Sequence, residues 1–304
     1  YSPAARRIHL AAEQDEFRIG RMQWIYLSML ESCNRAGVHW LPSARVVACE
    51  PGTITIARRN HTEKIAVRFV IGADGARSVV ARQLGLDRTS DFLVGMEEIV
   101  GSRSEPALHC FLDPRIAPGY IAWVATDGET AHVGVAGYPN LFNPAGALET
   151  FRNRVKDLAG GRVIERRGGF IPVNGILGRI ANDRGLLVGD AAGAVSPLTA
   201  GGLDGAMRLS SLAAGVTAAY LEKNDASILR EYEGTRFQTR FLARRWMRRL
   251  MRFAMNPMVT EFAFAVMTTP LVRAMARHIF FSRGGSFPEV SVPSVLSVVK
   301  TVHH

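Results

Sequence analysis

The sequence predicts a mixed α/β fold with an inserted antiparallel sheet and a helical C-terminal region. Three observations predict it. Two apolar stretches, at 66–71 and 184–188, each lead into a glycine-rich turn and then into a helical pattern. Between them, residues 91–137 contain strand-like stretches with no helix, which favours an antiparallel sheet. Beyond residue 228, apolar positions recur at helical spacing.

Length and composition exclude several classes of protein. At about 150 residues per domain, the chain of 304 residues is long enough for two domains. A hydrophobic content of 47% and a charged content of 21% are typical of globular proteins and exclude fibres and wholesale disorder. The three cysteines, Cys33, Cys49 and Cys110, form no C-x-x-C pair, so we expect neither a metal site nor a disulfide framework. We see no secretion signal and no spanning helix, and expect a cytoplasmic location.

The sequence of residues 20–71 predicts a helix and four short strands. Met22, Ile25 and Met29 recur at helical spacing within residues 20–37, and Gly37 stands where a C-terminal cap belongs. Strand patterns follow at 38–41, 44–50, 53–58 and 65–71. The last of these leads into the first glycine-rich turn and a helix from residue 78.

The remaining elements follow in the same way. Strands are expected at 92–100, 107–112, 120–125, 132–136 and 162–170, and a helix at 145–158. A long helix begins at Leu203, and further helices are expected at 228–255, 262–267 and 271–281. The domain boundaries predicted from these changes are 1–90 with 180–235 for a partial first domain, 91–179 for an antiparallel-sheet domain, and 236–304 for a basic helical region.

The net charge of +10 is concentrated near the C-terminus. Residues 230–285 hold eleven arginines and three glutamates, but no RNA-binding motif or zinc-finger spacing, so we expect no nucleic-acid partner. Five arginines, Arg236, Arg240, Arg244, Arg248 and Arg252, recur at four-residue spacing, with Phe237, Phe241, Trp246 and Leu250 as the apolar positions. Three interpretations stay open: a helix that lies on a membrane, a docking face for an acidic protein partner, and a solvated helix face.

The two glycine-rich turns share a chemical feature. Each places an aspartate, Asp74 or Asp190, at the end of a strand and just before a helix. Glycine lets a ligand approach the backbone closely, and a helix N-terminus attracts an anion. Each aspartate could accept a hydrogen bond from a sugar-type hydroxyl, or could cap its own turn.

Together the two turns resemble the signatures of a known family. Residues 72–80, G-A-D-G-A-R-S-V-V, resemble the first flavin signature of flavoproteins with the p-hydroxybenzoate hydroxylase fold. Residues 189–202, G-D-A-A-G followed by P-L-T-A-G-G, resemble their second signature. Residues 170–173, Trp123 and the helix that starts at Arg21 are similar to the geranylgeranyl reductase branch, and the likeness covers roughly residues 18–235.

The sequence departs from the family pattern at three places. Ala200 stands where P-L-T-G-x-G has its first glycine, and Ile25 replaces the aspartate of the R-x-x-F-D-x-x-L helix. No G-x-G occurs in the sequence. The first βαβ unit of this family normally carries that motif and the ADP half of FAD. The sequence therefore resembles a family member without its N-terminal portion, with an incomplete Rossmann-like FAD-binding domain.

The resemblance implies site residues for FAD and substrate. The implied cofactor-binding residues are Arg21, Asp74, Gly75, Gly189, Asp190, Ala191, Gly193, Pro197, Gly201, Gly202 and Leu203. Tyr120, Trp123 and Phe170 are implied as walls of a substrate pocket. His109, His132, Glu97 and Glu98 lie in the same sheet region, where a side chain could assist protonation. The flavin carries the redox chemistry, so no particular catalytic residue is identified.

The implied function is reduction of an alkene in a prenyl or other hydrophobic substrate by FAD, with NAD(P)H as an electron donor. A flavin-dependent monooxygenase that hydroxylates or epoxidises its substrate shares every residue named above and stays an alternative. A non-catalytic subunit or fragment that needs an N-terminal partner to bind FAD is a second one. The expected location is cytoplasmic, with peripheral membrane attachment left open.

Overall fold

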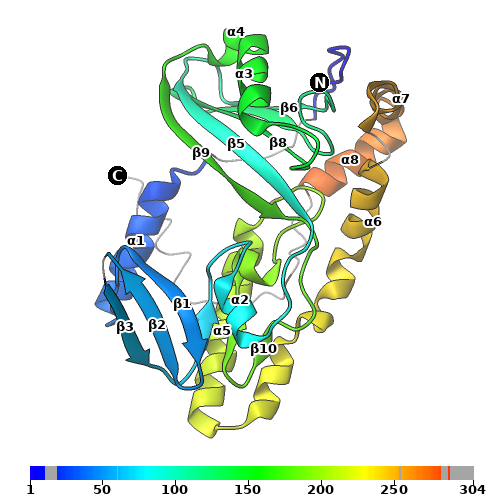
Figure 1. The fold of residues 1–304 in the computed structure, drawn as a ribbon. Helices are drawn as coiled ribbons and strands as arrows, with labels where there is room; N and C mark the ends of the chain where they lie inside the picture. The colour runs from blue at the N-terminus through cyan, green and yellow to red at the C-terminus, as the bar shows by residue number, and fades with distance from the viewer. Residues whose placement is uncertain (11–18, 60, 253–254, 282–286, 288–304) are drawn as a thin grey trace. The chain divides into compact units, whose positions relative to one another are not determined.

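The computed structural model describes residues 1–10, 19–59, 61–252, 255–281 and 287. The chain divides into two compact units (Figure 1). Unit 1 comprises Tyr1–Ile19, Asp91–Val173 and Leu242–Gly284. Unit 2 comprises Gly20–Ser90, Asn174–Phe241 and Gly285–His304. The C-terminal helices are thus grouped with the antiparallel sheet, whereas the sequence predicts a separate region from residue 236.

Unit 2 begins with helix α1 (Met22–Arg35) and an antiparallel sheet of β1 (Ala44–Glu50), β2 (Thr53–Arg58) and β3 (His61–Ala66). No residue of α1 is buried, although the helix carries Trp24, Tyr26 and Leu27. β1 and β2 turn at Pro51-Gly52, where Gly52 has a positive φ of 72° that favours glycine. These elements confirm the predicted helix and the strands at 44–50 and 53–58.

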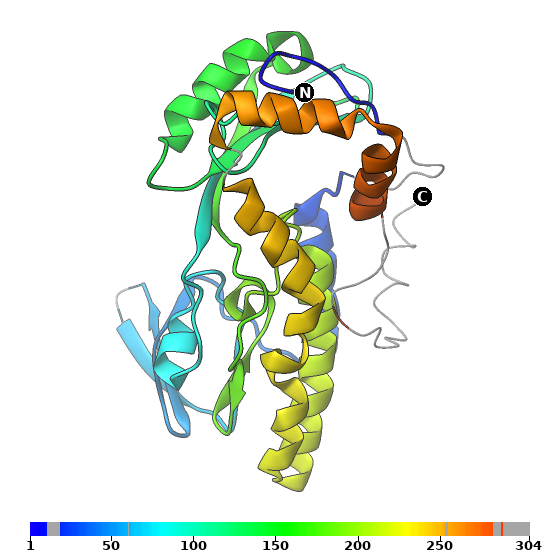
Figure 2. The ribbon, with the colours of Figure 1, turned by 90° about the vertical axis from the view of Figure 1, so that its right-hand side faces the viewer.

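A second sheet of unit 2 holds both strand–turn–helix segments. It has the order β10 (Ala181–Asn182), β11 (Gly185–Leu187), β4 (Val70–Gly72), and β11 runs parallel to β4. Helix α2 (Val79–Leu84) follows β4, and α5 (Leu203–Lys223) follows β11 after the short turn η1 (Gly189–Ala192). Figure 2 shows the 3-10 segment η2 (Ala226–Tyr232) returning along α5. Leu186, Leu187, Leu209 and Tyr232, each fully buried, anchor the core between them.

Unit 1 is built on a five-stranded antiparallel sheet. Its order is β6 (Ala107–Phe111), β7 (Ala122–Thr126), β8 (Thr130–Gly137), β5 (Phe92–Gly101), β9 (Val163–Pro172). Helices α3 (Pro144–Arg154) and α4 (Lys156–Ala159) cover one face of it (Figures 1 and 2). Leu148 and Phe151 of α3 pack there on alternate strand residues such as Val124 and Val133. The predicted antiparallel sheet is confirmed.

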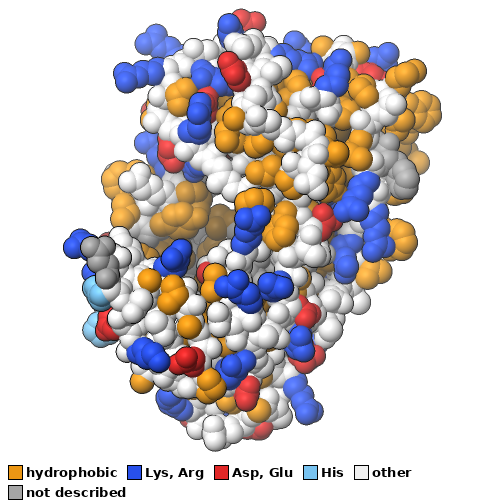
Figure 3. Space-filling view, in the orientation of Figure 1, with side chains coloured by type: hydrophobic (Ala, Val, Ile, Leu, Met, Phe, Trp, Pro, Cys, Tyr) orange, Lys and Arg blue, Asp and Glu red, His pale blue; other side chains and the backbone are white. Residues whose placement is uncertain are grey.

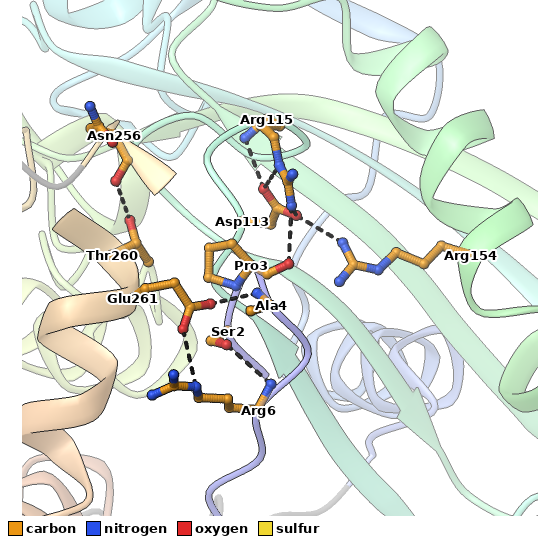
Figure 4. A network of polar contacts seen from close by, with 10 residues as sticks. All are labelled: Ser2, Pro3, Ala4, Arg6, Asp113, Arg115, Arg154, Asn256, Thr260 and Glu261. Atoms are coloured by element: carbon orange, nitrogen blue, oxygen red, sulfur yellow. Dashed lines mark hydrogen bonds and ion pairs between the residues drawn. The ribbon is translucent and has the colours of Figure 1, made fainter. Parts of the chain in front are cut away.

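Three further helices complete unit 1: α6 (Leu242–Met251), α7 (Pro257–Met267) and α8 (Pro270–Phe281). Figure 4 shows how α7 is fastened to the N-terminal segment. Glu261 accepts a hydrogen bond from the backbone N–H of Ala4 at 2.5 Å and pairs with Arg6 at 3.7 Å. Asp113 lies close by, held by Arg115 and Arg154. This network determines which side of α7 faces the unit.

The structure corrects three predicted elements. Residues 38–41 form no strand, and the predicted strand at 65–71 is split between β3 and β4 because the chain leaves one sheet for another. The predicted helix at 228–255 is a series of 3-10 turns, η2, η3 (Gly234–Arg236) and η4 (Gln238–Phe241), followed by α6. Gly234 explains part of this, since its ideal Cβ position lies 1.9 Å from the carbonyl oxygen of Leu177 and the chain has to follow that close contact.

The arginine series therefore forms no continuous exposed face. Arg248 is only 3% exposed, and its guanidinium group lies over the rings of Tyr120 and Tyr138. Arg252 donates a hydrogen bond to Asp91 at 2.6 Å. Of the four apolar positions in this series, Phe237 and Phe241 are buried, whereas Trp246 and Leu250 are exposed. No helix among the described residues combines the length and apolar character needed to cross a bilayer.

Candidate functional site

The parallel pairing of β11 with β4 brings the two glycine-rich turns together. Leu186 lies opposite Ile71 in the register, and the N–H of Val188 donates to the carbonyl oxygen of Gly72 at 2.9 Å. Both strands therefore end at the same edge of the sheet. Turns at the carboxyl edge of parallel strands are where open α/β sheets bind ligands. The predicted residues of the two signatures thus belong to neighbouring turns of one unit.

The carboxylate of Asp74 is occupied by its own turn. It accepts hydrogen bonds from the hydroxyl of Ser78 at 2.5 Å and from the N–H groups of Val79 and Val80 at 2.6 and 3.0 Å. These are the free donors at the start of α2, so Asp74 caps that helix. Gly75 next to it has a φ of 80° and no atom within 4 Å of its ideal Cβ position. The turn is rigid, and its glycine leaves the backbone open to a ligand.

The second turn is built around close backbone contacts. Gly189 and Gly193 have φ values of 56° and 71°, in the left-handed region that favours glycine. A Cβ atom on Gly193 would lie 2.5 Å from the carbonyl oxygen of Gly175. Ala191 is buried between these glycines. The G-D-A-A-G pattern is therefore needed for the shape of the turn as well as for any ligand contact.

Asp190 differs from Asp74. Among the described residues, no group donates a hydrogen bond to its carboxylate, and burial raises the pKa of that carboxyl group. The ideal Cβ position of Gly202 lies 3.3 Å from Oδ1 of Asp190, so the carboxylate lies against the residue that precedes α5. A half-buried acceptor without a donor is suited to a hydroxyl group supplied by a ligand.

The loop from Pro197 to Gly202 connects this turn to α5. The N–H of Ser196 donates to the carbonyl oxygen of Gly201 at 3.0 Å, which closes the loop. Ala200 has a φ of 53°, so the residue that departs from the family pattern occupies a conformation favoured by glycine. Leu203 begins α5 and is exposed, and no side chain caps this end of the helix.

Two residues that the sequence reasoning missed support the site. A Cβ atom on Gly205 would lie 2.5 Å from the carbonyl oxygen of Ala194, so this glycine lets α5 pack against the second turn. The hydroxyl of Tyr232 donates to the carbonyl oxygen of Leu187 at 2.8 Å, at the point where β11 ends. No short sequence motif could have revealed these two residues, because each contact joins residues that lie in different elements of the chain.

Arg21, predicted beside the cofactor, is the residue that precedes α1 and is exposed. It belongs to the same unit as the two turns. Its role at a phosphate stays a prediction.

In unit 1, the face of the sheet opposite α3 carries a polar cluster. His132 and Glu97 are 3.1 Å apart between Nδ1 and Oε1, and the indole N–H of Trp123 donates to Oε2 of Glu97 at 2.9 Å. Burial alone would raise the pKa of Glu97, but the hydrogen bonds from His132 and Trp123 hold that pKa below its usual value. Trp123 lies flat on Gly134, where a Cβ atom would be 2.1 Å from the ring. We call these three residues the Glu97 cluster.

The other predicted residues of the sheet lie elsewhere. Phe170 pairs with Val94, three positions along β9 from the residue opposite Glu97, so it points to the face opposite Trp123. Trp123 and Phe170 therefore do not form one pocket wall on this sheet. Glu98 is buried on the α3 side and pairs with Arg152 and Arg166. His109 contacts the hydroxyl of Tyr1, and burial lowers the pKa of its imidazole. Tyr120 lies beneath Arg248.

Comparison with known proteins gives similar sequences and similar solved structures. No family model matches the chain. It is 33% identical over 226 residues to digeranylgeranylglycerophospholipid reductase 1 of Methanopyrus kandleri, an alignment that covers 69% of this chain and 60% of the relative. It is 34% identical over 179 residues to reductase 2 of that name from Methanothermobacter thermautotrophicus, covering 56% and 46%. The chain thus spans about half to three-fifths of the length of these relatives.

A solved structure described as geranylgeranyl bacteriochlorophyll reductase-like, from Thermoplasma acidophilum, matches with a TM-score of 0.74 and 21% identity over 99% of this chain and 77% of that one. An anhydrotetracycline hydroxylase from Streptomyces rimosus matches with a TM-score of 0.52 and 17% identity over 86% and 56% of the two chains. The predicted fold class is confirmed by these likenesses.

Proposed function

We propose that this chain, a homologue of the digeranylgeranylglycerophospholipid reductases with the fold of flavin-dependent oxidoreductases, acts in the FAD-dependent reduction of an alkene. The substrate that its relatives' name indicates is a prenyl lipid, and a hydrophobic substrate of that class is proposed here. The observation that carries the proposal is the pair of neighbouring turns at one sheet edge, each with the residue pattern of a flavin signature.

The residues of the second turn fit FAD. The carboxylate of Asp190 is half-buried and lacks a donor among the described residues, and a ribityl or ribose hydroxyl would provide one. The uncapped N-terminus of α5 at Leu203 would stabilise negative charge on the flavin. Gly75 leaves room for the cofactor against the backbone. Bound FAD would supply the hydride chemistry, and these residues would bind and orient it.

The Glu97 cluster is proposed to position the polar part of the substrate. Glu97 stays ionised because His132 and Trp123 donate to it, and an ionised Glu97 in turn orients His132. His132 then presents its other ring nitrogen, Nε2, as a proton donor or acceptor. Trp123 offers an apolar surface beside it. No group of three or more His, Cys, Asp or Glu side chains that could hold a metal ion occurs in the described part of the chain.

NAD(P)H is proposed as the electron donor for the flavin. A monooxygenase reaction is the second candidate, and the structural likeness to an anhydrotetracycline hydroxylase favours keeping it. Oxygen separates the two reactions. A reductase turns over its substrate anaerobically, whereas a monooxygenase consumes oxygen in step with its substrate.

A peripheral location at a membrane follows from the proposed substrate, because a prenyl lipid resides in a lipid phase. The chain would reach that substrate from the membrane surface.

The first test is titration of the purified chain with FAD, followed by the visible spectrum and flavin fluorescence. Saturable binding that weakens at least tenfold in Asp190→Ala, and not in Asp183→Ala, supports the proposed site. Asp183 is a suitable control because it lies in the same unit and is exposed. Anaerobic incubation of the reduced complex with a prenyl lipid should then add one H₂ per reduced double bond, measured by mass spectrometry.

If the purified chain by itself binds no FAD, this result would support the remaining alternative, a non-catalytic subunit or fragment that needs an N-terminal partner. Restoration of FAD binding by the N-terminal dinucleotide-binding portion that the family resemblance implies, supplied on the same chain or separately, would then confirm that interpretation.

A further inference from the structure

The helices of unit 1 present apolar residues outward. On α6, Leu242, Trp246 and Leu250 recur every four residues, and Trp246 and Leu250 are 58% and 64% exposed. On α7, Met258, Phe262 and Val266 recur in the same way, with Met258 and Phe262 exposed by 80% and 72%. Residues spaced by four lie on one side of a helix. We call these six residues the outer stripe.

The inner sides of both helices are already engaged. Arg248 of α6 and Arg252, the residue that follows this helix, contact Tyr138, and Arg252 also donates a hydrogen bond to Asp91. On α7, Thr260 and Phe264 are buried and Glu261 is held by Ala4 and Arg6 (Figure 4). The outer stripe is therefore exposed because each helix is fixed by its opposite side. An amphipathic surface helix usually turns its apolar side inward, so this orientation needs an explanation.

The charge around the outer stripe indicates which kind of partner would cover it, a second copy of this chain or an anionic lipid surface. The segment from Leu242 to Arg277 holds seven arginines and one glutamate. Arg249 is exposed and lies over the ring of Trp246 at 5.0 Å, and Arg273 and Arg277 are exposed on α8 next to Leu271 and Met275. Figure 3 shows apolar side chains together with arginines on the side of the molecule where α6 to α8 lie. A second copy of this chain would bring like charges together, whereas an anionic lipid surface would neutralise them.

We propose that the outer stripe and its flanking arginines dock the protein on an anionic membrane surface, with the apolar side chains inserted at the level of the head groups. Trp and Arg suit this depth, since both combine an apolar body with a polar tip. The proposal rests on the lipid substrate of the proposed function and names the surface that would meet it. It also replaces the interpretation in which Arg236–Arg252 forms the docking face, because Arg248 is buried.

The test is sedimentation of the full chain with two kinds of vesicle, phosphatidylcholine alone and equal parts of phosphatidylcholine and phosphatidylglycerol. We expect binding to the anionic vesicles, weaker binding to the neutral ones, and weakening by salt. The double variant Trp246→Ser, Leu250→Ser should bind both kinds of vesicle about tenfold more weakly than the wild type, or more weakly still. Ile164→Ser is the matched control, since Ile164 is 65% exposed on β9 of the same unit and should leave binding unchanged.

A second pair of variants tests the charge. Arg249→Gln and Arg277→Gln should each reduce binding to anionic vesicles by about fivefold, which corresponds to about 1 kcal/mol per basic residue near the surface, and should leave binding to neutral vesicles unchanged. Arg103→Gln, at an exposed position outside the helices, is the control.

The proposal is overturned if the wild type ignores both vesicles, or if the stripe variants bind as the wild type does. It is also overturned if sedimentation equilibrium shows a dimer that the stripe variants convert to a monomer. Vesicle binding is measured without FAD or turnover, so its outcome is independent of the proposed reaction. If the chain binds vesicles but reduces no alkene, the docking proposal stands and the proposed function fails. If the chain reduces an alkene but binds no vesicles, the proposed function stands and the docking proposal fails.

Discussion

Asp190 is a carboxylate that the fold buries in part without providing a donor. Burial raises its pKa above the ordinary value for aspartate, so the folded state binds a proton more tightly than the unfolded state does. A group of this kind contributes most to stability below its unfolded pKa. That contribution is lost as the pH rises from the unfolded pKa through the raised folded pKa.

The prediction is that Asp190→Asn stabilises the cofactor-free protein at neutral pH and weakens FAD binding. The gain in the free energy of unfolding should disappear as the pH falls toward the ordinary pKa of aspartate, because the wild-type group is then neutral as well. Thermal unfolding at several pH values measures this, with the exposed Asp183→Asn as the control. A gain that persists at the lowest pH would contradict the assignment to ionisation.

Ala200 carries backbone strain at a family glycine position. Its φ of 53° costs an L-residue about 1 kcal/mol relative to glycine. We therefore predict that Ala200→Gly raises the free energy of unfolding, by about 0.5 to 1 kcal/mol after the entropic cost of glycine in the unfolded chain. Ala214→Gly, on an exposed position of α5, should lower it by about 1 kcal/mol. Urea unfolding measures the change in the free energy of unfolding for both variants. If Ala200→Gly lowers this free energy as Ala214→Gly does, the loop carries no strain at Ala200.

At the scale of elements, α6 is oriented by its arginines. The guanidinium of Arg248 is buried, and its three nitrogen atoms have no hydrogen-bond partner among the residues that the structure describes. Its stabilising contacts are the rings of Tyr120 and Tyr138. Leaving a buried charge without hydrogen bonds is costly, and an apolar side chain of similar length avoids that cost.

We predict that Arg248→Met leaves stability unchanged or raises it, by up to about 2 kcal/mol. Arg252→Met should lower it by about 1 kcal/mol or less, because the pair with Asp91 is half-exposed. Chemical denaturation of the two variants tests this difference. A loss of several kcal/mol in Arg248→Met would mean that the guanidinium has an anionic partner in solution.

At the scale of the whole molecule, the described residues form two separate hydrophobic cores. One, in unit 2, joins α2, β11 and α5, and the other, in unit 1, joins the five-stranded sheet and α3. Each core is formed by residues of its own unit only. A defect in one core should therefore be felt first within its own unit.

The prediction is tested with Leu209→Ala in unit 2 and Phe151→Ala in unit 1, both fully buried. Each should cost about 3 to 5 kcal/mol. Hydrogen exchange with mass spectrometry should show loss of protection in peptides of the substituted unit, and little change in the other. Equal loss in both units for either variant would indicate that the two cores unfold as one.

Local signals were sufficient for the turns of the site. Gly75, Gly189 and Gly193 are required by backbone angles that the chain adopts over a few residues, and Asp74 caps a helix that begins five residues later. Such contacts lie within one sequence window, so the motif and its structure correspond. The five-stranded sheet was predictable for the same reason, since each strand has its own alternation and turns.

Contacts between distant residues decided the rest. The side chains of Trp123 and Phe170 look equivalent in the sequence, yet the register of β7, β8, β5 and β9 sends them to opposite faces. The helical pattern of α6 separates an apolar side from an arginine side and leaves open which side is buried. The contacts of Arg248 with Tyr138 and of Arg252 with Asp91 leave Trp246 exposed. Periodicity defines two sides of a helix or strand. Only the surface against which it packs determines which side is buried, and for α6 that surface comes from residues more than one hundred positions away.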